Sequence, residues 1–189
     1  MKKITIISLL LIVCLSLAGC GLYNDKSVNG NSTIKGEVTQ KGNFADLKVM
    51  PQFKVKDIND HEVTNDIFKD KKLTMINIWG TFCSPCIDEM PALQELYSKY
   101  KAQGFNLVGV VSDGEMDEVQ ALQILKKLKI DYVNLIPNKK LSSDFVGKTM
   151  IVPVSVFVNS QGEILETVAG SKSKEDYQKI IETELQQVR

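Results

Sequence analysis

Two cysteines separated by two residues, Cys83 and Cys86, have a spacing that suits reversible thiol–disulfide exchange. They follow an apolar run, Leu73 to Trp79, and precede a segment with helical periodicity. A strand that feeds a helix here places the first thiol at the helix N-terminus, where free backbone N–H groups and the helix dipole favour a thiolate. The second thiol lies one turn later, so the pair can open when an outside thiolate attacks and close again through a mixed disulfide.

The N-terminus has the pattern of a secretory signal. A basic start, Met1 to Lys3, is followed by a mostly apolar run, Ile4 to Leu17, and then by Leu17-Ala18-Gly19-Cys20. The last four residues resemble the bacterial lipobox, in which the signal is cleaved before a cysteine that becomes lipidated. We therefore expect residues 1–19 to be a lipoprotein signal peptide and Cys20 to carry the lipid. The alternative is an uncleaved membrane anchor, for which the apolar run is short.

The cysteine count then favours redox chemistry over a structural disulfide. Cys14 leaves with the signal and Cys20 carries lipid, so Cys83 and Cys86 remain as the thiols of the mature body, and no disulfide framework is possible. A disulfide that closes so short a loop stabilises a fold little, so a purely structural disulfide is the weaker explanation for this pair. Either reading of the N-terminus places the body outside the cytoplasm, where disulfides persist.

Composition predicts one globular domain behind a flexible segment. The chain has 23 basic and 23 acidic residues among 189, and loss of the signal leaves it slightly negative, which argues against a nucleic-acid partner. Residues 20–45 are rich in Gly, Asn, Ser and Lys and predict a lipidated flexible tether with a mean reach of about 25–30 Å. Residues 46–189 are expected to fold as the domain.

Alternating strand and helix patterns predict an α/β sheet with covering helices. Strands are expected at 53–56, 61–64, 73–79, 105–112, 132–136, 154–158 and 164–168. Helices are expected at 84–102, 116–128 and 174–188, with a short helical turn at 66–69. Gly104 is expected to end the first long helix, and Pro91 to kink it. The turn at 159–162 predicts a terminal hairpin that adds antiparallel strands to the sheet edge.

The residues around the cysteines resemble the signature of the thioredoxin-like TlpA/ResA family of membrane-anchored thiol–disulfide oxidoreductases. The pattern W-x-x-[WF]-C-x-x-C-x-x-E-x-P runs from Trp79 to Pro91, and Ile151-Val152-Pro153 is similar to the family's cis-proline segment. The resemblance covers about residues 47–188. It implies a thioredoxin-like fold with a central mixed sheet flanked by helices, an N-terminal hairpin and a strand–helix insertion within 105–136. Phe82 departs from the commoner tryptophan and keeps an aromatic shield.

Each cysteine has an expected role. Cys83 is the expected nucleophile, because the outer thiol at a helix start is exposed and electrostatically favoured. Cys86 is the expected resolving thiol, and the reverse order is the alternative. The family match implies that Val152 and a cis Pro153 bind an extended substrate beside the disulfide. Trp79 is left open between core packing and the substrate groove.

Glu89 is the candidate proton carrier. It lies three residues after Cys86 and so returns to nearly the same helix face. Thioredoxins carry a buried acid six residues before the first cysteine, where this chain has Asn77, which cannot exchange a proton. A carboxyl in a half-buried pocket has a raised pKa and can pass a proton to or from Cys86. The alternative is an exposed glutamate on the helix surface.

These residues predict an extracytoplasmic enzyme that reduces protein disulfides through its CSPC dithiol. A disulfide-donating oxidase and a metal-binding carrier are the alternatives, although two cysteines and the distant His61 supply few ligands. No phosphate-binding loop or flavin fingerprint is present, so we expect no cofactor and no metal. Electrons must come from a partner, for which the resemblance implies a membrane donor of the CcdA/DsbD type. The expected substrates are oxidised or disulfide-bearing extracytoplasmic proteins.

Overall fold

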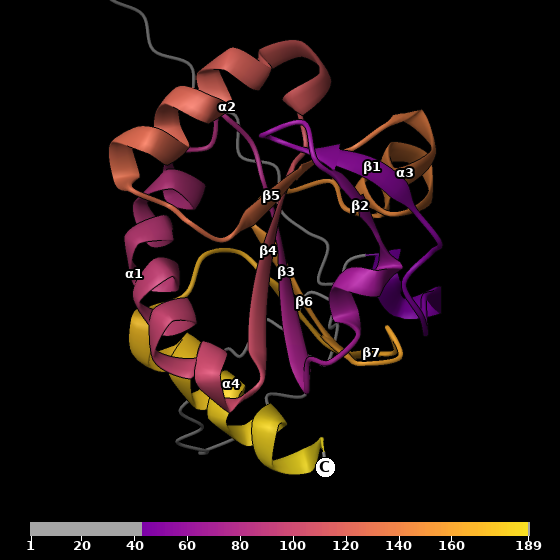
Figure 1. Ribbon diagram of the computed structural model, residues 1–189, viewed down its shortest axis with the longest axis vertical. Coiled ribbons are helices and arrows are strands. Elements are labelled where there is room, and N and C mark those ends of the chain that lie inside the picture. Colours follow the sequence, from indigo (N-terminus) through magenta and orange to yellow (C-terminus); the bar gives the residue numbers. More distant parts are fainter. Residues whose placement is uncertain (1–42, 189) are drawn as a thin grey trace, which may run out of the picture. The chain divides into compact units, whose positions relative to one another are not determined.

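The structure is a computed structural model that describes residues 43–188, and a mixed sheet of seven strands lies at the centre of this part of the chain (Figure 1). The expected signal peptide at 1–19, the expected lipidation site Cys20 and nearly all of the expected tether lie outside the described residues.

The elements follow the predicted order with small shifts at their ends. The strands are β1 (Lys54–Asp57), β2 (Glu62–Thr64), β3 (Leu73–Trp79), β4 (Phe105–Val111), β5 (Val133–Ile136), β6 (Val154–Asn159) and β7 (Ile164–Ala169). The α-helices are α1 (Ser84–Tyr100), α2 (Gly114–Leu128), α3 (Lys139–Asp144) and α4 (Lys174–Gln187). Short 3₁₀ helices are η1 (Asn43–Asp46), η2 (Asn65–Phe68), η3 (Lys101–Gln103) and η4 (Val146–Lys148).

The strand order is β2-β1-β5-β4-β3-β6-β7. The central strands β3, β4 and β5 run parallel, whereas β1, β2, β6 and β7 pair in the antiparallel sense. The N-terminal hairpin, the parallel insertion and the terminal hairpin are therefore confirmed. Because β3 and β4 are parallel neighbours, their carboxyl ends lie at the same edge of the sheet, and β6 begins at that edge.

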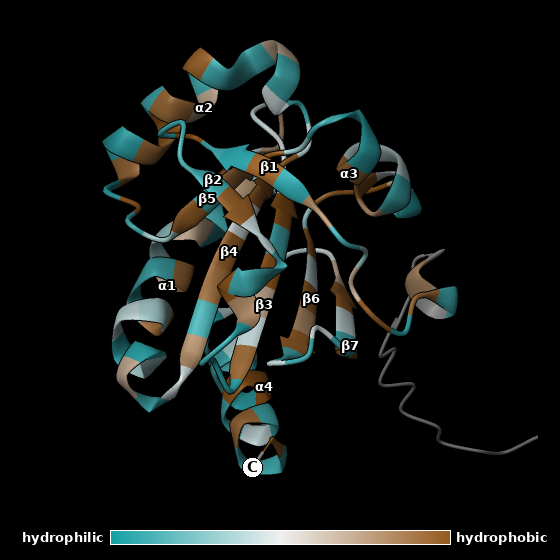
Figure 2. Cartoon of the chain, turned by 45° about the vertical axis from the view of Figure 1, so that its right-hand side comes forward, coloured by the Kyte–Doolittle hydropathy of each residue, from teal (hydrophilic) through white to brown (hydrophobic). Residues whose placement is uncertain are grey.

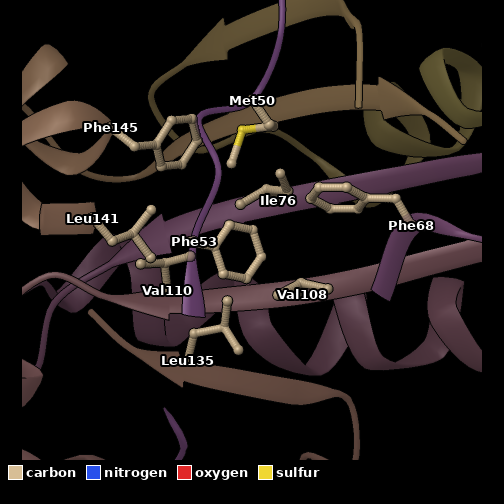
Figure 3. A pocket seen from close by; sticks show the side chains of 9 residues that line it. All are labelled: Met50, Phe53, Phe68, Ile76, Val108, Val110, Leu135, Leu141 and Phe145. Carbon is tan, nitrogen blue, oxygen red and sulfur yellow. The ribbon is translucent and has the colours of Figure 1, made fainter. Parts of the chain in front are cut away.

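Burial on both faces explains the apolar character of the central strands. All seven residues of β3 are buried, and alternate ones pack on opposite faces. On one face, nine apolar side chains close around a void of about 10 Å³ (Figure 3), which is dry in character because no polar group lines it. Those side chains belong to Met50, Phe53, Phe68, Ile76, Val108, Val110, Leu135, Leu141 and Phe145.

Helices cover the other face of the sheet. Helix α1 contacts both α2 and α4, and all three lie together on one side of the strands (Figure 1). Their hydropathy alternates along the ribbon (Figure 2), as expected for helices with one buried face. Helix α1 ends at Tyr100, two residues earlier than predicted, and Gly104, with a positive φ of 96°, caps the following 3₁₀ helix η3 rather than α1 itself. Helix α1 continues through Pro91 without interruption.

Three features of the structure were not expected from the sequence. In the helix predicted at 116–128, two apolar side chains face solvent, since Met116 is 82% exposed and Val119 is 71% exposed. Helix α3 was not expected, because only Leu141 of its short mixed sequence is buried. The packed domain also begins before residue 46, because Phe44 is buried against Phe145 with ring centroids 5.2 Å apart.

Trp79 belongs to the core rather than to the substrate groove, so its expected binding role is wrong. Its side chain is fully buried, and Nε1 donates a hydrogen bond to Asn134 Oδ1 at 2.9 Å. Asn134 Nδ2 in turn donates to the Tyr132 carbonyl at 2.9 Å. Gly109 on β4 leaves the space for this pair, because a Cβ there would lie 2.0 Å from Asn134 Oδ1.

We predict that Gly109→Ala destabilises the fold by about 2–4 kcal/mol, because the added methyl group overpacks the core and displaces the Trp79–Asn134 hydrogen bond. Urea unfolding of the variant, followed by tryptophan fluorescence, measures the change. A decrease in the free energy of unfolding below about 0.5 kcal/mol, the range of neutral surface substitutions, would contradict the prediction. It would show that β4 and β5 move apart readily enough to accommodate the methyl group.

Candidate active site

The structure joins Cys83 and Cys86 in a disulfide at the start of α1. Cys83 is the N-cap residue of this helix, and its sulfur accepts a hydrogen bond from the Cys86 N–H at 3.3 Å. Cys83 is 6% exposed and Cys86 is fully buried. The outer thiol is therefore less exposed than expected, but it is still the sulfur that an outside partner can approach. The helix N-terminus supplies the donor that favours its thiolate.

The segment before β6 lies against the disulfide. The Val152–Pro153 peptide bond is cis, as the resemblance implies. Cys83 Sγ lies 3.6 Å from the Val152 carbonyl oxygen, within reach of a hydrogen bond from the reduced thiol. Pro153 is buried and Val152 is partly exposed, so Val152 is the residue of this segment that can meet a substrate.

An open groove of about 600 Å³ runs beside Cys83. Three of the residues in its wall are exposed apolar side chains: Phe82 at 71%, Met150 at 93% and Ile151 at 49%. The full lining is Phe82, Cys83, Ser84, Pro85, Ser112, Val146, Thr149, Met150, Ile151 and Val152. Among the described residues, no charged side chain lines the groove. An apolar surface of this kind around a reactive sulfur suits contact with another protein chain.

Glu89 is buried more deeply than expected, with only 5% of its surface exposed. Asn77 Nδ2 donates to its Oε1 at 3.0 Å, and the Tyr177 hydroxyl donates to its Oε2 at 3.3 Å. Burial raises the pKa of the Glu89 carboxyl above its ordinary value, and hydrogen bonds from Ser171, Asn77, the Lys172 N–H and Tyr177 offset part of the rise. The expected proton carrier thus has the raised pKa that such a role requires, and the exposed alternative is wrong.

Two further residues complete the network around this carboxyl, and sequence reasoning missed both. Ser155 on β6 accepts from Asn77 Nδ2 at 3.2 Å and lies 3.1 Å from the Tyr177 hydroxyl. Burial raises the pKa of the Tyr177 phenol, and the neighbouring Glu89 charge adds to the effect. Asn77 and Tyr177 both donate to Glu89, and Ser155 links these two donors. No pattern along the chain marks Ser155 or Tyr177, because their partners are 78 and 88 residues away.

Two other findings concern the possibilities of a metal site and of a membrane-spanning helix. Within residues 43–188, no group of three or more His, Cys, Asp and Glu side chains is placed to hold a metal ion. None of the helices in that same stretch has the length and apolar character needed to cross a membrane. His61 is exposed in the β1–β2 turn beside Asp57, far in the chain from the disulfide.

Known proteins are similar to this chain in sequence and in fold. The AhpC/TSA family matches residues 47–167, more than half of the chain. Thiol-disulfide oxidoreductase ResA of Bacillus cereus is 29% identical over 148 residues, which cover 74% of this chain and 82% of that protein. The ResA protein of Oceanobacillus iheyensis is 32% identical over 126 residues, which cover 64% and 63%. A thioredoxin-family thiol:disulfide interchange protein from Chlorobium tepidum superposes with a TM-score of 0.65 at 21% identity, covering 73% of this chain and 96% of that one.

These similarities confirm the resemblance that the cysteine signature suggested. The ResA relatives match most of the chain, and the solved structure shows the same fold. The disulfide lies where the sequence of β3 and α1 predicted it, at the wall of an open groove. The chain therefore belongs to the AhpC/TSA family, as a redox enzyme with a thioredoxin-like fold.

Proposed function

We propose that this protein is an extracytoplasmic protein-disulfide reductase. The observation that carries the proposal is the placement of the Cys83–Cys86 pair, with Cys83 facing an uncharged groove and a buried acid, Glu89, one helical turn beyond Cys86. The groove suits a polypeptide substrate, and Val152 offers backbone groups beside the reactive sulfur.

The reaction begins from the reduced dithiol. The Cys83 thiolate attacks one sulfur of the substrate disulfide, so a Cys83–substrate S–S bond forms as the substrate's own S–S bond breaks. The leaving substrate sulfur takes up a proton. Cys86 then attacks Cys83 Sγ, which releases the second substrate thiol and forms the Cys83–Cys86 disulfide that the structure contains. Two electrons pass from the dithiol to the substrate.

Glu89 supports the second step. Cys86 must lose its proton to attack, and it is buried away from water. A carboxylate on the same helix face accepts that proton, and burial of Glu89 raises its pKa toward the range in which the transfer is efficient. When the pair is reduced again, the same carboxyl returns the proton to Cys86.

The reducing direction follows from the charge near the pair. An oxidant needs a strongly stabilised thiolate, because its reduced form must be the stable one. The Glu89 carboxylate opposes a thiolate on Cys86, and no described Lys or Arg lines the groove to favour one on Cys83. A copper or zinc carrier is disfavoured, because the pair lacks further ligands in the described part of the chain.

The N-terminus supports a place at the membrane surface. The lipobox-like residues before Cys20 suggest that the signal is removed and that lipid holds the mature chain. The tether that precedes Phe44 then lets the domain reach its partners. Since the sequence has no nicotinamide or flavin fingerprint, a membrane dithiol donor of the CcdA/DsbD type returns the pair to its reduced form.

The reduction potential of the pair tests the direction. We expect a value nearer about −270 mV than about −120 mV, because the buried acid disfavours the thiolate. Equilibration of the purified protein with glutathione, followed by mass spectrometry of the trapped thiols, gives the potential. A value above about −180 mV, in the range of isomerases and oxidants, would assign the protein to disulfide donation.

Lipidation at Cys20 is a second expectation. In cells, Cys20→Ala is expected to abolish labelling by a fatty-acid probe and to change the size of the mature chain, because processing before this cysteine depends on its modification. Fractionation and gel mobility measure both effects. Unchanged size and unchanged membrane retention would show that the apolar run acts as an uncleaved anchor.

A third expectation concerns Glu89→Gln. The variant should fold and form the Cys83 mixed disulfide but turn over about 10²-fold more slowly, because no group accepts the Cys86 proton. In the native protein, turnover should fall as pH decreases through the raised pKa of Glu89, since only the carboxylate accepts a proton. That inflection should be absent in the variant.

Glu95→Gln is the matched control, because Glu95 is an exposed acid on the same helix. Its turnover and pH profile should match those of the native protein. Equal rates and equal pH profiles for Glu89→Gln and the native protein would show that water carries the proton.

A further inference from the structure

Asp113 stands at the N-cap of α2 but does not cap that helix. An aspartate at this position ordinarily accepts hydrogen bonds from the first turn of its own helix. Here the side chain turns instead toward the loop between β3 and α1. Both carboxylate oxygens accept from the Thr81 N–H, at 3.1 and 3.0 Å, and Oδ2 also accepts from the Thr81 hydroxyl at 2.6 Å.

We propose that Asp113 is a positioning residue for Cys83, which fixes the loop leading to the nucleophile and whose negative charge opposes formation of the Cys83 thiolate. Nothing in the CSPC signature points to this residue, which lies 32 residues from Thr81 in the sequence. The inference rests on the proposed use of Cys83 as the attacking thiol.

The contact between Asp113 and Thr81 is buried. Asp113 is 8% exposed and Thr81 is 7% exposed, so the bonds between them are shielded from water. Charge-assisted hydrogen bonds of this kind are stronger than neutral ones. The Ser112 N–H donates to the Trp79 carbonyl at 2.7 Å, which places Asp113 directly opposite the residues that follow β3.

The loop has little freedom to move once Thr81 is held. The Cys83 N–H donates to the Gly80 carbonyl at 3.1 Å and closes a tight turn around Thr81. A Cβ on Gly80 would lie 2.6 Å from the Phe82 ring and 3.0 Å from Ser112 Oγ, so the ring packs directly on the backbone. Holding Thr81 therefore sets the place of both Phe82 and Cys83 in the groove wall.

The charge acts on the same sulfur. None of the ion pairs among residues 43–188 includes Asp113, so no cation neutralises its carboxylate. Thr81 precedes Cys83 by two residues, which span at most about 7 Å of chain. Asp113 is buried at its contact with Thr81, so water and salt screen its charge less than that of an exposed carboxylate. A thiol and a disulfide are neutral, so only the thiolate experiences this repulsion.

Two substitutions separate the two effects. Asp113→Asn keeps acceptor and donor atoms for Thr81 but removes the charge, whereas Asp113→Ala removes both. Asp117→Asn is the matched control, because Asp117 is an exposed aspartate in the first turn of the same helix. All are made in the full-length chain, purified in detergent.

The first measurement is the pH dependence of Cys83 alkylation by iodoacetamide in the reduced protein, followed by mass spectrometry. We expect the Cys83 pKa to fall by about 0.5–1 unit in both Asp113 variants, because a repulsive charge is removed. The control should not shift. Above the measured Cys83 pKa both variants should also be more oxidising than the native protein, and well below that pKa, where the thiol is protonated, the difference should vanish.

The second measurement is kcat/KM for reduction of a disulfide-bonded protein. Asp113→Ala should lose about 10-fold or more relative to Asp113→Asn, because only the alanine variant releases the loop. Thr81→Val, which loses the hydroxyl but keeps the charge nearby, should lose rate without lowering the Cys83 pKa. This variant carries the positioning test if Asp113→Ala does not fold.

An unchanged Cys83 pKa in Asp113→Asn would overturn the electrostatic part of the proposal. Native rates in both Asp113→Ala and Thr81→Val would overturn the positioning part. The alkylation comparison uses no substrate disulfide, so it is independent of the direction of the native reaction. An oxidising native protein that still shows these differences would overturn the reductase assignment and leave the role of Asp113 intact.

Discussion

The parallel pairing of β3 with β4 is the constraint on which the rest of this structure depends. The seven paired positions run from Leu73 with Phe105 to Trp79 with Val111, so both strands end at the same edge of the sheet. Whatever follows each strand must meet there. Thr81 follows β3 and Asp113 follows β4, which explains how residues 32 apart in the sequence come to share one loop contact.

The antiparallel strand β6 brings the third component to that edge. Its first residue, Val154, pairs with Ile78 near the end of β3, so the preceding Val152–Pro153 segment lies beside the start of α1. The groove wall thus combines three connections, those between β3 and α1, between β4 and α2, and before β6. Paired strands hold these connections in place.

Burial of polar groups on the helix-covered face costs stability and serves the chemistry. Glu89, Asn77, Ser155 and Tyr177 occupy space that apolar side chains could fill, and Asn77 Oδ1 is buried without a hydrogen-bond partner among the described residues. An unpaired buried acceptor typically costs about 1–3 kcal/mol. Burial raises the pKa of this carboxyl, and the donors of the network offset part of the rise.

Much of the fold could be predicted from local patterns, and much of the site could not. The central strands are continuous apolar runs bounded by turn residues, and all were found close to their observed ends. Cys83, Cys86 and Glu89 share one short segment whose spacing indicates their chemistry. Helix α3 escaped notice because one buried residue, Leu141, creates no periodicity. Trp79 was ambiguous because its partner, Asn134, lies 55 residues away on β5.

The redox behaviour of the pair follows from a competition between backbone and side chains. The N-terminus of α1 favours a thiolate on Cys83, and the Cys86 N–H is already directed at that sulfur. Glu89 lies beyond Cys86 on the same helix and Asp113 holds the loop before Cys83, so acids approach the pair from both sides along the chain. The groove itself carries no charge that could add to either side. A helix end contributes about 0.3–1 kcal/mol toward the Cys83 thiolate. The two carboxylates act against it, and this opposition is what favours the proposed reducing direction over disulfide donation.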